Sequence, residues 1–167
     1  DEEKREKVIE KIIDAQKNGY NTVVVMSAIG RSPQPYATDS LLRLIKPNDD
    51  CDVCLREQDM LISCGEVISC VVLSQMLKNK GYDAVSLTGW QSCIITDDNY
   101  SEARIVKIEP EIVLSYLKKG VIPIITGFQG ISQHGSITTL GRGGSDTTAT
   151  MLGAVLKAEA VEIYTDV

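Results

Sequence analysis

The sequence predicts an α/β fold of three layers, in which helices cover both faces of a mostly parallel sheet. The first observation is a set of short apolar runs typical of buried strands, such as residues 22–26 and 121–126. The second is that these runs alternate with longer segments in which apolar residues recur at helical spacing, as in residues 3–18. Strands that alternate with helices favour a parallel sheet between two helical layers.

The first half of the chain carries two long helical patterns and one strand. Ile9, Ile12 and Ile13 share one face of the first pattern, and Gly19 is typical of a residue that ends a helix. The run at 22–26 is bounded by polar residues and is expected to be a strand buried on both faces. The expected order is a helix over 3–18, a strand over 22–26, a short helix over 38–44 and a long helix over 56–80.

The second half contains the remaining strands. Pro110 opens a helix at a position where its missing N–H group costs nothing, and Gly120 ends that helix. The segment 131–139 is short and polar, which is consistent with a hairpin. The expected order is a strand over 84–87, shorter strands near 93–95 and 104–108, a helix over 110–120, a strand over 121–126, the hairpin, a helix over 145–158 and a last strand over 161–164.

Composition excludes several functional classes. The chain has 167 residues, of which 43% are hydrophobic and 24% charged, as is typical of one globular domain. Its formal net charge is −6 and its Lys and Arg residues are scattered, which argues against a nucleic-acid-binding protein. No apolar run approaches the ~18 residues that a transmembrane helix needs, and the charged residues 1–7 do not resemble a signal peptide. We therefore expect a cytoplasmic protein with neither a nucleic acid nor a membrane as partner.

The cysteines do not predict a metal site. The chain has five of them, an odd number in a sequence of this size, so a disulfide framework is not expected. Cys51 and Cys54 form a CxxC pair, but no second CxxC or His pair follows to complete the four ligands of a zinc site. This pattern favours reduced thiols over a bound metal.

Polar and glycine-rich segments follow the expected strands. In open α/β sheets, ligands bind beyond the carboxyl ends of the strands. The positions after four of the expected strands are residues 27–30, 88–91, 127–130 and 165–166, and all of them are small, polar or rich in glycine. One such loop would be ordinary, but four along one edge indicate a ligand-binding edge.

The strongest single segment is Gly-Arg-Gly-Gly-Ser-Asp at residues 141–146. Its glycines allow the backbone to approach a ligand, and Ser145 is expected to be the N-cap of a helix whose free N–H groups favour an anion. The planar fork of Arg142 suits a carboxylate or a phosphate. Asp146 would repel a phosphate by itself, so its expected partner is a cation, either a Lys or a metal. The alternative is an ordinary glycine-rich helix entry with a solvated Arg, since this pattern is neither a Walker A loop nor GxGxxG.

With these residues laid out, the chain resembles the aspartate kinases of the amino acid kinase family over nearly all of its length. The string Thr-Thr-Leu-Gly-Arg-Gly-Gly-Ser-Asp at 138–146 is the most specific landmark. The other landmarks are Val-Met-Ser-Ala-Ile-Gly at 25–30, Tyr-Ala-Thr-Asp at 36–39, Ser-Cys-Gly-Glu at 63–66, Thr-Gly-Trp-Gln at 88–91, Gly-Phe-Gln-Gly at 127–130 and Tyr-Thr-Asp-Val at 164–167.

The resemblance implies an enzyme that transfers a phosphoryl group from ATP, with Mg²⁺, to the side-chain carboxylate of L-aspartate. The product is 4-phospho-L-aspartate, the first intermediate in the biosynthesis of lysine, threonine and methionine. Arg142 and Asp146 would be catalytic, with Arg142 on a substrate carboxylate and Asp146 orienting a catalytic Lys, while Glu66 would hold the α-ammonium group. The implied substrate-binding residues are Ser27, Thr38, Glu66, Arg142, Gly143 and Ser145, and the implied nucleotide-binding residues are Thr165 and Asp166.

Glu66 also has a simpler interpretation. It lies within an apolar helical pattern, where a charged residue is often on a solvated face. Gly65 beside it would allow a ligand or another segment to come close, which favours a functional role.

The resemblance also carries departures. Residues 1–167 are expected to be a partial catalytic domain, because the family's Lys-Phe-Gly-Gly strand, the rest of its nucleotide-binding part and its regulatory domains are not in this sequence. Cys93 stands where the family usually has Gly. From these gaps we expect the fragment itself to have little or no kinase activity, and an unpaired sheet edge to favour a homodimer or a larger homo-oligomer. The alternatives are another kinase of this fold, acting on glutamate or carbamate, and a non-catalytic fragment that binds aspartate or self-associates.

Overall fold

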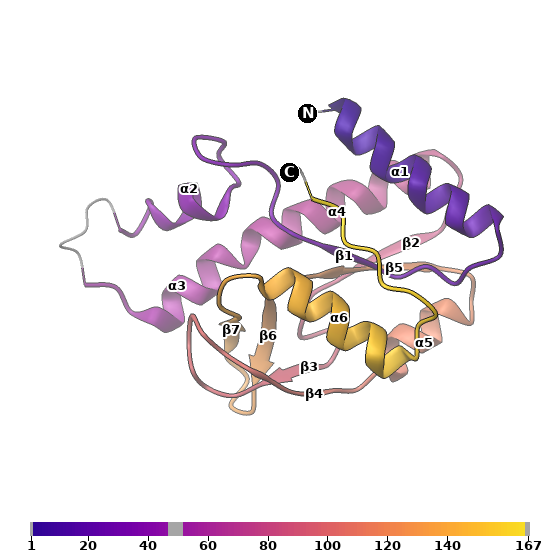
Figure 1. Cartoon of the computed structure of the whole chain (residues 1–167). Helices are drawn as coiled ribbons and strands as arrows, with labels where there is room; N and C mark the ends of the chain where they lie inside the picture. Colours follow the sequence, from indigo (N-terminus) through magenta and orange to yellow (C-terminus); the bar gives the residue numbers. More distant parts are fainter. Residues whose placement is uncertain (1, 47–51, 166–167) are drawn as a thin grey trace.

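The computed structural model of the chain (Figure 1) describes residues 2–46 and 52–165. Helices and strands alternate as the sequence predicts, and nearly every expected element is found within a few residues of its expected place. The elements are α1 (Glu2–Lys17), β1 (Val24–Met26), α2 (Thr38–Leu42), α3 (Leu55–Ile62), α4 (Cys64–Asn79), β2 (Ala84–Leu87), β3 (Ile94–Thr96), β4 (Ile105–Ile108), α5 (Glu111–Leu117), β5 (Ile122–Thr126), β6 (Gln129–Ser132), β7 (Ile137–Thr139) and α6 (Gly144–Leu156).

The central sheet is parallel and has the strand order β1-β5-β2. Strand β5 lies in the middle and all of its residues are buried, as expected of a strand covered on both faces. Strand β1 pairs with β5 through Val24 opposite Ile124, and its three residues are only half-buried. The expectation that the run at 22–26 is buried on both faces is therefore wrong, because β1 lies at the edge of this sheet.

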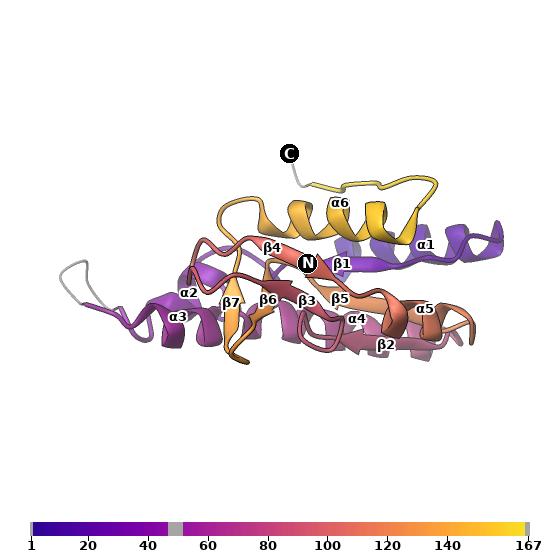
Figure 2. The ribbon, with the colours of Figure 1, turned by 90° about the horizontal axis from the view of Figure 1, so that it is seen from below.

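Helices cover both faces of the central sheet, which confirms the three-layer α/β architecture. One apolar cluster joins α1 and α4 to Ile122 and Ile124 of β5, while a second joins α5 and α6 to Ile125. Successive side chains of a strand point to opposite faces, so β5 serves both clusters. In the view of Figure 2, α6 lies on one side of the strands and α4 on the other.

A second sheet of order β4-β3-β6-β7 continues from the carboxyl end of β5. Strands β6 and β7 form the expected hairpin, while β3 pairs with β6 in parallel and with β4 antiparallel. Only Gly127 and Phe128 separate β5 from β6. This short connection brings the second sheet directly against the edge where ligands are expected.

The long helix expected over 56–80 is divided into α3 and α4 by a turn at Ser63. By length and composition alone, Leu55–Asn79 could cross a membrane, but half of its most apolar window is buried inside the structure. Helix α4 packs on β2 and β5. The apolar character of this segment is thus explained by its place in the core.

The last expected strand, over 161–164, is not formed. Val161, Ile163 and Tyr164 lie in an exposed coil after α6. A strand needs a partner for its backbone N–H and C=O groups. In the described part of the chain, none of the strand pairings includes this segment, and Figure 2 shows it running along α6, away from the sheet.

Candidate functional site

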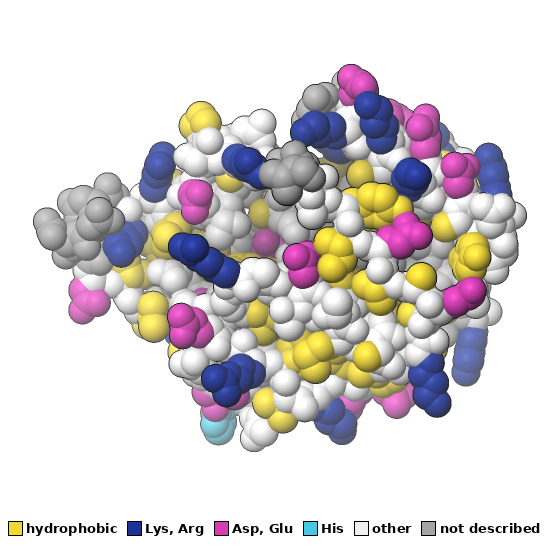
Figure 3. All heavy atoms as spheres, in the orientation of Figure 1, with side chains coloured by type: hydrophobic (Ala, Val, Ile, Leu, Met, Phe, Trp, Pro, Cys, Tyr) yellow, Lys and Arg dark blue, Asp and Glu magenta, His cyan; other side chains and the backbone are white. Residues whose placement is uncertain are grey.

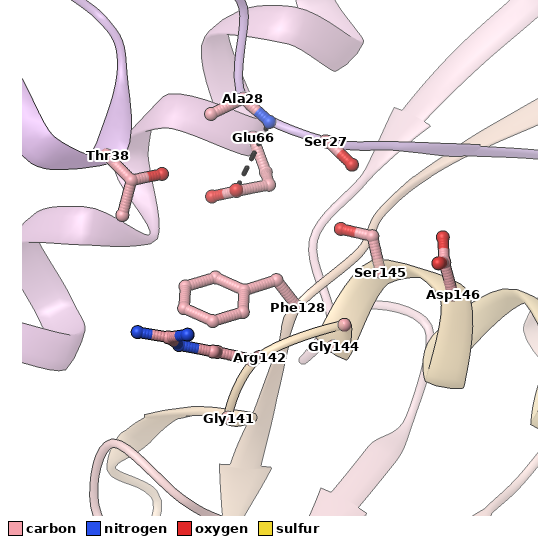
Figure 4. A pocket seen from close by; sticks show the side chains of 11 residues that line it. Ser27, Ala28, Thr38, Glu66, Phe128, Gly141, Arg142, Gly144, Ser145 and Asp146 are labelled. Carbon is pink, nitrogen blue, oxygen red and sulfur yellow. Dashed lines mark hydrogen bonds between the residues drawn. The ribbon is translucent and has the colours of Figure 1, made fainter. Parts of the chain in front are cut away.

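A cavity of about 270 Å³ lies beyond the carboxyl ends of β1 and β5 (Figure 4). It is formed by the segments after β1 and β5, the first turn of α4, the loop after β7 and the start of α6. Its lining residues are Ser27, Ala28, Thr38, Glu66, Phe128, Gly141, Arg142, Gly143, Gly144, Ser145 and Asp146.

The glycine-rich loop differs from expectation in where its helix begins. Helix α6 starts at Gly144, and its N-cap is Gly143, whose φ of 73° lies in the left-handed region that favours glycine. Ser145 is therefore not the N-cap, as the sequence had suggested, but lies in the first turn. The consequence favours a ligand site, because the first turn of α6 lines the cavity and the first N–H groups of a helix have no intrahelical partner.

The segment after β1 approaches the first turn of α4 because Gly65 has no side chain. A Cβ atom at Gly65 would lie 2.9 Å from the Cβ of Ala28 and 3.0 Å from the carbonyl oxygen of Tyr36. Such contacts are too close for a real side chain. Gly65 thus brings the backbone of Ala28 next to Glu66, in agreement with the close approach that the sequence indicated.

Glu66 is buried, with 2% of its surface exposed, so it does not lie on a solvated helix face. The backbone N–H of Ala28 donates a hydrogen bond to Oε1 of Glu66 at 3.2 Å. Oε2 is also buried and has no hydrogen-bond partner. Burial raises the pKa of Glu66 to about 7, against the weaker lowering effect of backbone hydrogen bonds. A buried carboxylate oxygen without a partner costs free energy unless a ligand supplies a donor.

Arg142 supplies the opposite charge on the wall of the same cavity. Its side chain is exposed, and in the view of Figure 4 the ring of Phe128 lies between the Arg142 guanidinium and the Glu66 carboxylate. Ser145 and Asp146 occupy the first turn of α6 on the remaining side. A cavity with a buried carboxylate and a separate guanidinium suits a small molecule that carries both an ammonium group and carboxylates.

Most of the predicted site residues come together. Every predicted catalytic and substrate-binding residue lines the cavity, whereas Thr165 lies in the exposed coil after α6 and Asp166 is outside the described residues. The loop 88–91 does not line the cavity either, so only part of the expected ligand edge converges there.

The structure adds lining residues that were not among the predicted ones. They are Ala28, Phe128, Gly141 and Gly144, and all of them belong to the landmark strings. Phe128 has a positive φ of 67°, which is unusual for a side chain of this size. No pattern in the sequence indicates that strain, although its place directly after β5 does indicate proximity to the ligand edge.

Charge and metal ligands around the cavity are sparse. Among the residues that the structure describes, there is no group of three or more His, Cys, Asp or Glu side chains that could hold a metal. Cys54 of the CxxC pair is an exposed free thiol, and Cys51 lies outside the described residues. On the face drawn in Figure 3, Lys and Arg are scattered among acidic residues. An anion bound here would depend on Arg142 and local N–H groups rather than on a broad positive field.

Comparison with known proteins agrees with this geometry. The sequence profile of the amino acid kinase family matches residues 1–167. Aspartokinase 1 of Bacillus subtilis (strain 168) is 46% identical over 167 residues, which are 100% of this chain and 41% of that protein. The chain thus spans about two fifths of the length of the curated relatives it matches.

Solved structures show the same likeness. The crystal structure of aspartate kinase from Synechocystis has a TM-score of 0.76 and 42% identity, covering 99% of this chain and 26% of that one. The structure of E. coli aspartokinase III in complex with aspartate and ADP has a TM-score of 0.65 and 29% identity, covering 75% of this chain and 29% of that one.

Proposed function

The chain belongs to the amino acid kinase family, and from this premise we propose that it forms the aspartate-binding part of an aspartate kinase. The reaction joins an oxygen of the L-aspartate side-chain carboxylate to the γ-phosphorus of ATP. The bond from that phosphorus to the bridging oxygen breaks, and ADP leaves with its electrons. The resemblance to aspartokinases over the whole chain supports this substrate.

The unpaired oxygen of Glu66 is the observation that carries the proposal. Its Oε2 is buried and lacks a donor, at the wall of a cavity that also presents Arg142. The α-ammonium group of an amino acid supplies both the donors and the positive charge that this oxygen lacks. A neutral donor could satisfy the hydrogen bond but would not balance the charge of the carboxylate.

The other lining residues receive roles that fit their positions. Arg142 holds a substrate carboxylate through its two-pronged guanidinium. The hydroxyl groups of Ser27, Thr38 and Ser145 line the cavity and can donate to substrate oxygens. The backbone of Gly143 and the start of α6 face the transferring phosphoryl group, where free N–H groups and the helix dipole favour negative charge.

The nucleophile needs little activation, because an aspartate side chain is already ionised near pH 7. The chain's residues therefore act by placing two anions in line and by balancing charge, rather than by removing a proton.

Asp146 is the carboxylate at the phosphate side of the cavity. It would orient a cationic group there, a Lys or Mg²⁺. Mg²⁺ is commonly held by one or two carboxylates together with phosphate oxygens, which this single acidic residue fits. When bound with ATP, Mg²⁺ neutralises charge on the phosphates.

The wider setting belongs to the same proposal. The reaction would be the first step of lysine, threonine and methionine biosynthesis, in the cytoplasm. Thr165 and Asp166 would begin the region that holds ATP. A homodimer or larger homo-oligomer is proposed from the edge position of β1, whose outer side pairs with no strand in the described part of the chain.

A coupled assay of ADP release with L-aspartate and Mg-ATP tests the activity in the protein that contains this chain. We expect turnover with aspartate, and we expect Arg142→Ala to remove it. Arg104→Ala, which changes another exposed arginine outside the cavity, is the matched control and should leave turnover unchanged. Turnover with glutamate or carbamate instead of aspartate would overturn the substrate assignment. The expectation that residues 1–167 alone have little or no turnover stays a prediction, and the same assay on this chain tests it.

A further inference from the structure

Asp59 of α3 is a second buried carboxylate, and it is not part of the cavity. It is 0% exposed and accepts hydrogen bonds from two residues far away in the sequence. The backbone N–H and hydroxyl groups of Ser101 donate to it at 2.9 Å each. The backbone N–H and hydroxyl groups of Thr139 donate to it at 2.7 and 2.8 Å. Oδ2 of Asp59 therefore accepts the two backbone N–H groups and Oδ1 accepts the two hydroxyl groups, so both oxygens of the carboxylate have hydrogen-bond partners.

These bonds connect the two segments that carry the charged groups of the cavity. Asp59 precedes Glu66 by two helical turns, across the single turn at Ser63, and both residues are buried. Thr139 ends β7 and lies three positions before Arg142. Asp59 is thus connected through the helix backbone to Glu66, and through its hydrogen bonds with Thr139 to the strand that leads to Arg142.

The connection from Thr139 to the loop is short and stiff. Leu140 is buried, and its N–H donates to the carbonyl oxygen of Phe128 at 2.8 Å. The N–H of Phe128 in turn donates to the hydroxyl oxygen of Thr148 in α6 at 3.2 Å. The loop 141–143 is therefore held at its entrance by Asp59 and at its exit by α6. A shift of Thr139 relative to α3 would move Arg142 relative to Glu66.

We propose that Asp59 is a positioning residue that sets the span between the Glu66 carboxylate and the Arg142 guanidinium, and thereby the length of the amino acid that fits between them. The inference rests on the proposed function, in which these two groups bind the ammonium and a carboxylate of aspartate. Glutamate carries the same charges on a chain longer by one methylene group. A site whose span is fixed rejects such a homologue by about 10–200-fold, whereas a site free to widen does not.

Ser101 and Thr139 offer a matched pair of variants for testing this. Each donates a hydroxyl hydrogen bond to Oδ1 of Asp59, at 2.9 and 2.8 Å. Thr139→Val and Ser101→Ala each remove one such bond, but only Thr139 leads directly to Arg142. Both variants remove a hydrogen bond and alter the packing around Asp59. Only Thr139→Val also weakens the connection between Asp59 and the loop that carries Arg142.

The measurement is the ratio of the glutamate to the aspartate dissociation constant, with a melting curve for each variant. We expect Asp59→Ala to lower that ratio by about tenfold or more, as a methylene group ceases to be discriminated. Asp59→Asn should recover most of the ratio, because its carbonyl oxygen can accept from both N–H groups while its amide donates to both hydroxyl oxygens. Thr139→Val should lower the ratio clearly, and Ser101→Ala should leave it within about twofold, the scatter of context effects.

The outcomes separate the two claims. An equal ratio in Thr139→Val, Ser101→Ala and the unmodified protein would overturn the positioning role, even if all variants melt earlier. If Asp59→Ala does not fold, the Thr139 and Ser101 pair decides the question alone. If the unmodified protein binds neither amino acid, the proposed function fails and this inference fails with it. If aspartate binds but no variant changes the ratio, only the inference is overturned.

Discussion

Two buried carboxylates on neighbouring helices differ in whether their oxygens have hydrogen-bond partners. Asp59 on α3 accepts hydrogen bonds from both Ser101 and Thr139, each through its N–H and its hydroxyl group. In Glu66 on α4, Oε1 accepts a hydrogen bond from the backbone N–H of Ala28, and Oε2 has no partner. Burial alone therefore does not indicate function. The unsatisfied carboxylate faces a cavity, while the satisfied one holds the framework of that cavity together.

The largest expected effect is on stability, at the satisfied carboxylate. Asp59→Ala leaves the buried N–H and hydroxyl groups of Thr139, and the partly buried ones of Ser101, without their acceptor. We expect the free energy of unfolding to fall by about 3–5 kcal/mol, measured by urea denaturation. Glu66→Gln, which removes the unsatisfied charge, should leave the protein at neutral pH at least as stable as the unmodified chain. A loss of similar size in both variants would show that the two carboxylates are not different in kind.

The pH dependence of stability sharpens the same contrast. Burial raises the pKa of Glu66 from 4.5 to about 7, so between these values the folded state binds more protons than the unfolded state. Stability due to Glu66 is thus complete below pH 4.5 and is lost as the pH rises through 7, by about 3 kcal/mol in all.

The difference in unfolding free energy between the unmodified protein and Glu66→Gln isolates this contribution from other titrating groups. We expect the difference to shift in favour of Glu66→Gln between pH 4.5 and 7.5, in equilibrium denaturation at a series of pH values. Cys70, whose pKa is raised to about 12 by burial and by the charge of Glu66, does not titrate in this range. A difference that is flat over this interval would contradict the proposed environment of Glu66.

A smaller effect, on aspartate affinity, is expected from Gly65→Ala, which disturbs the hydrogen bond from the Ala28 N–H to the Glu66 side chain. The new Cβ would meet Ala28 and the Tyr36 carbonyl, pushing the segment after β1 away from α4. We expect aspartate affinity to fall about tenfold, equivalent to about 1.4 kcal/mol, measured by calorimetry. Gly141→Ala adds a Cβ in open space and is the control for stability, which it should leave unchanged.

The smallest effect is expected at a position that touches neither carboxylate. Cys93 has a φ of 53°, in the left-handed region where a side chain is disfavoured. Cys93→Gly should raise the free energy of unfolding by no more than about 1 kcal/mol and leave aspartate affinity unchanged. A marked loss of stability would mean that the Cys93 side chain contributes packing that outweighs the strain.

The sequence predicts helices and strands better than it predicts which buried polar groups find hydrogen-bond partners. Apolar runs that alternate with segments of helical spacing identify β5 and its covering helices, because the positions of apolar residues in the sequence indicate which residues are buried. It cannot identify Asp59, which resembles a solvated residue of an amphipathic helix until Ser101 and Thr139 are brought to it by the fold.

The expectations that are wrong depend on tertiary neighbours. The run 161–164 has the composition of a strand but lacks a strand beside it in the described structure. Ser145 has the chemistry of an N-cap, yet Gly143 adopts the cap position two residues earlier. Glu66 was open to two interpretations, and only its burial decides between them.

Calorimetric titration of L-aspartate near pH 6, in buffers of different ionisation enthalpy, tests the central claim most directly. At this pH most of the Glu66 carboxyl groups are protonated in the free protein, because the pKa is about 7. Binding of the aspartate ammonium group requires the ionised carboxylate of Glu66, so we expect close to one proton to be released per aspartate bound. We expect no proton release from this position above pH 8.5 or in Glu66→Gln. The affinity of Glu66→Gln for aspartate should also fall at least about 100-fold. Aspartate binding without proton release, and with equal affinity in Glu66→Gln, would contradict the assignment of Glu66 and with it the account of the site.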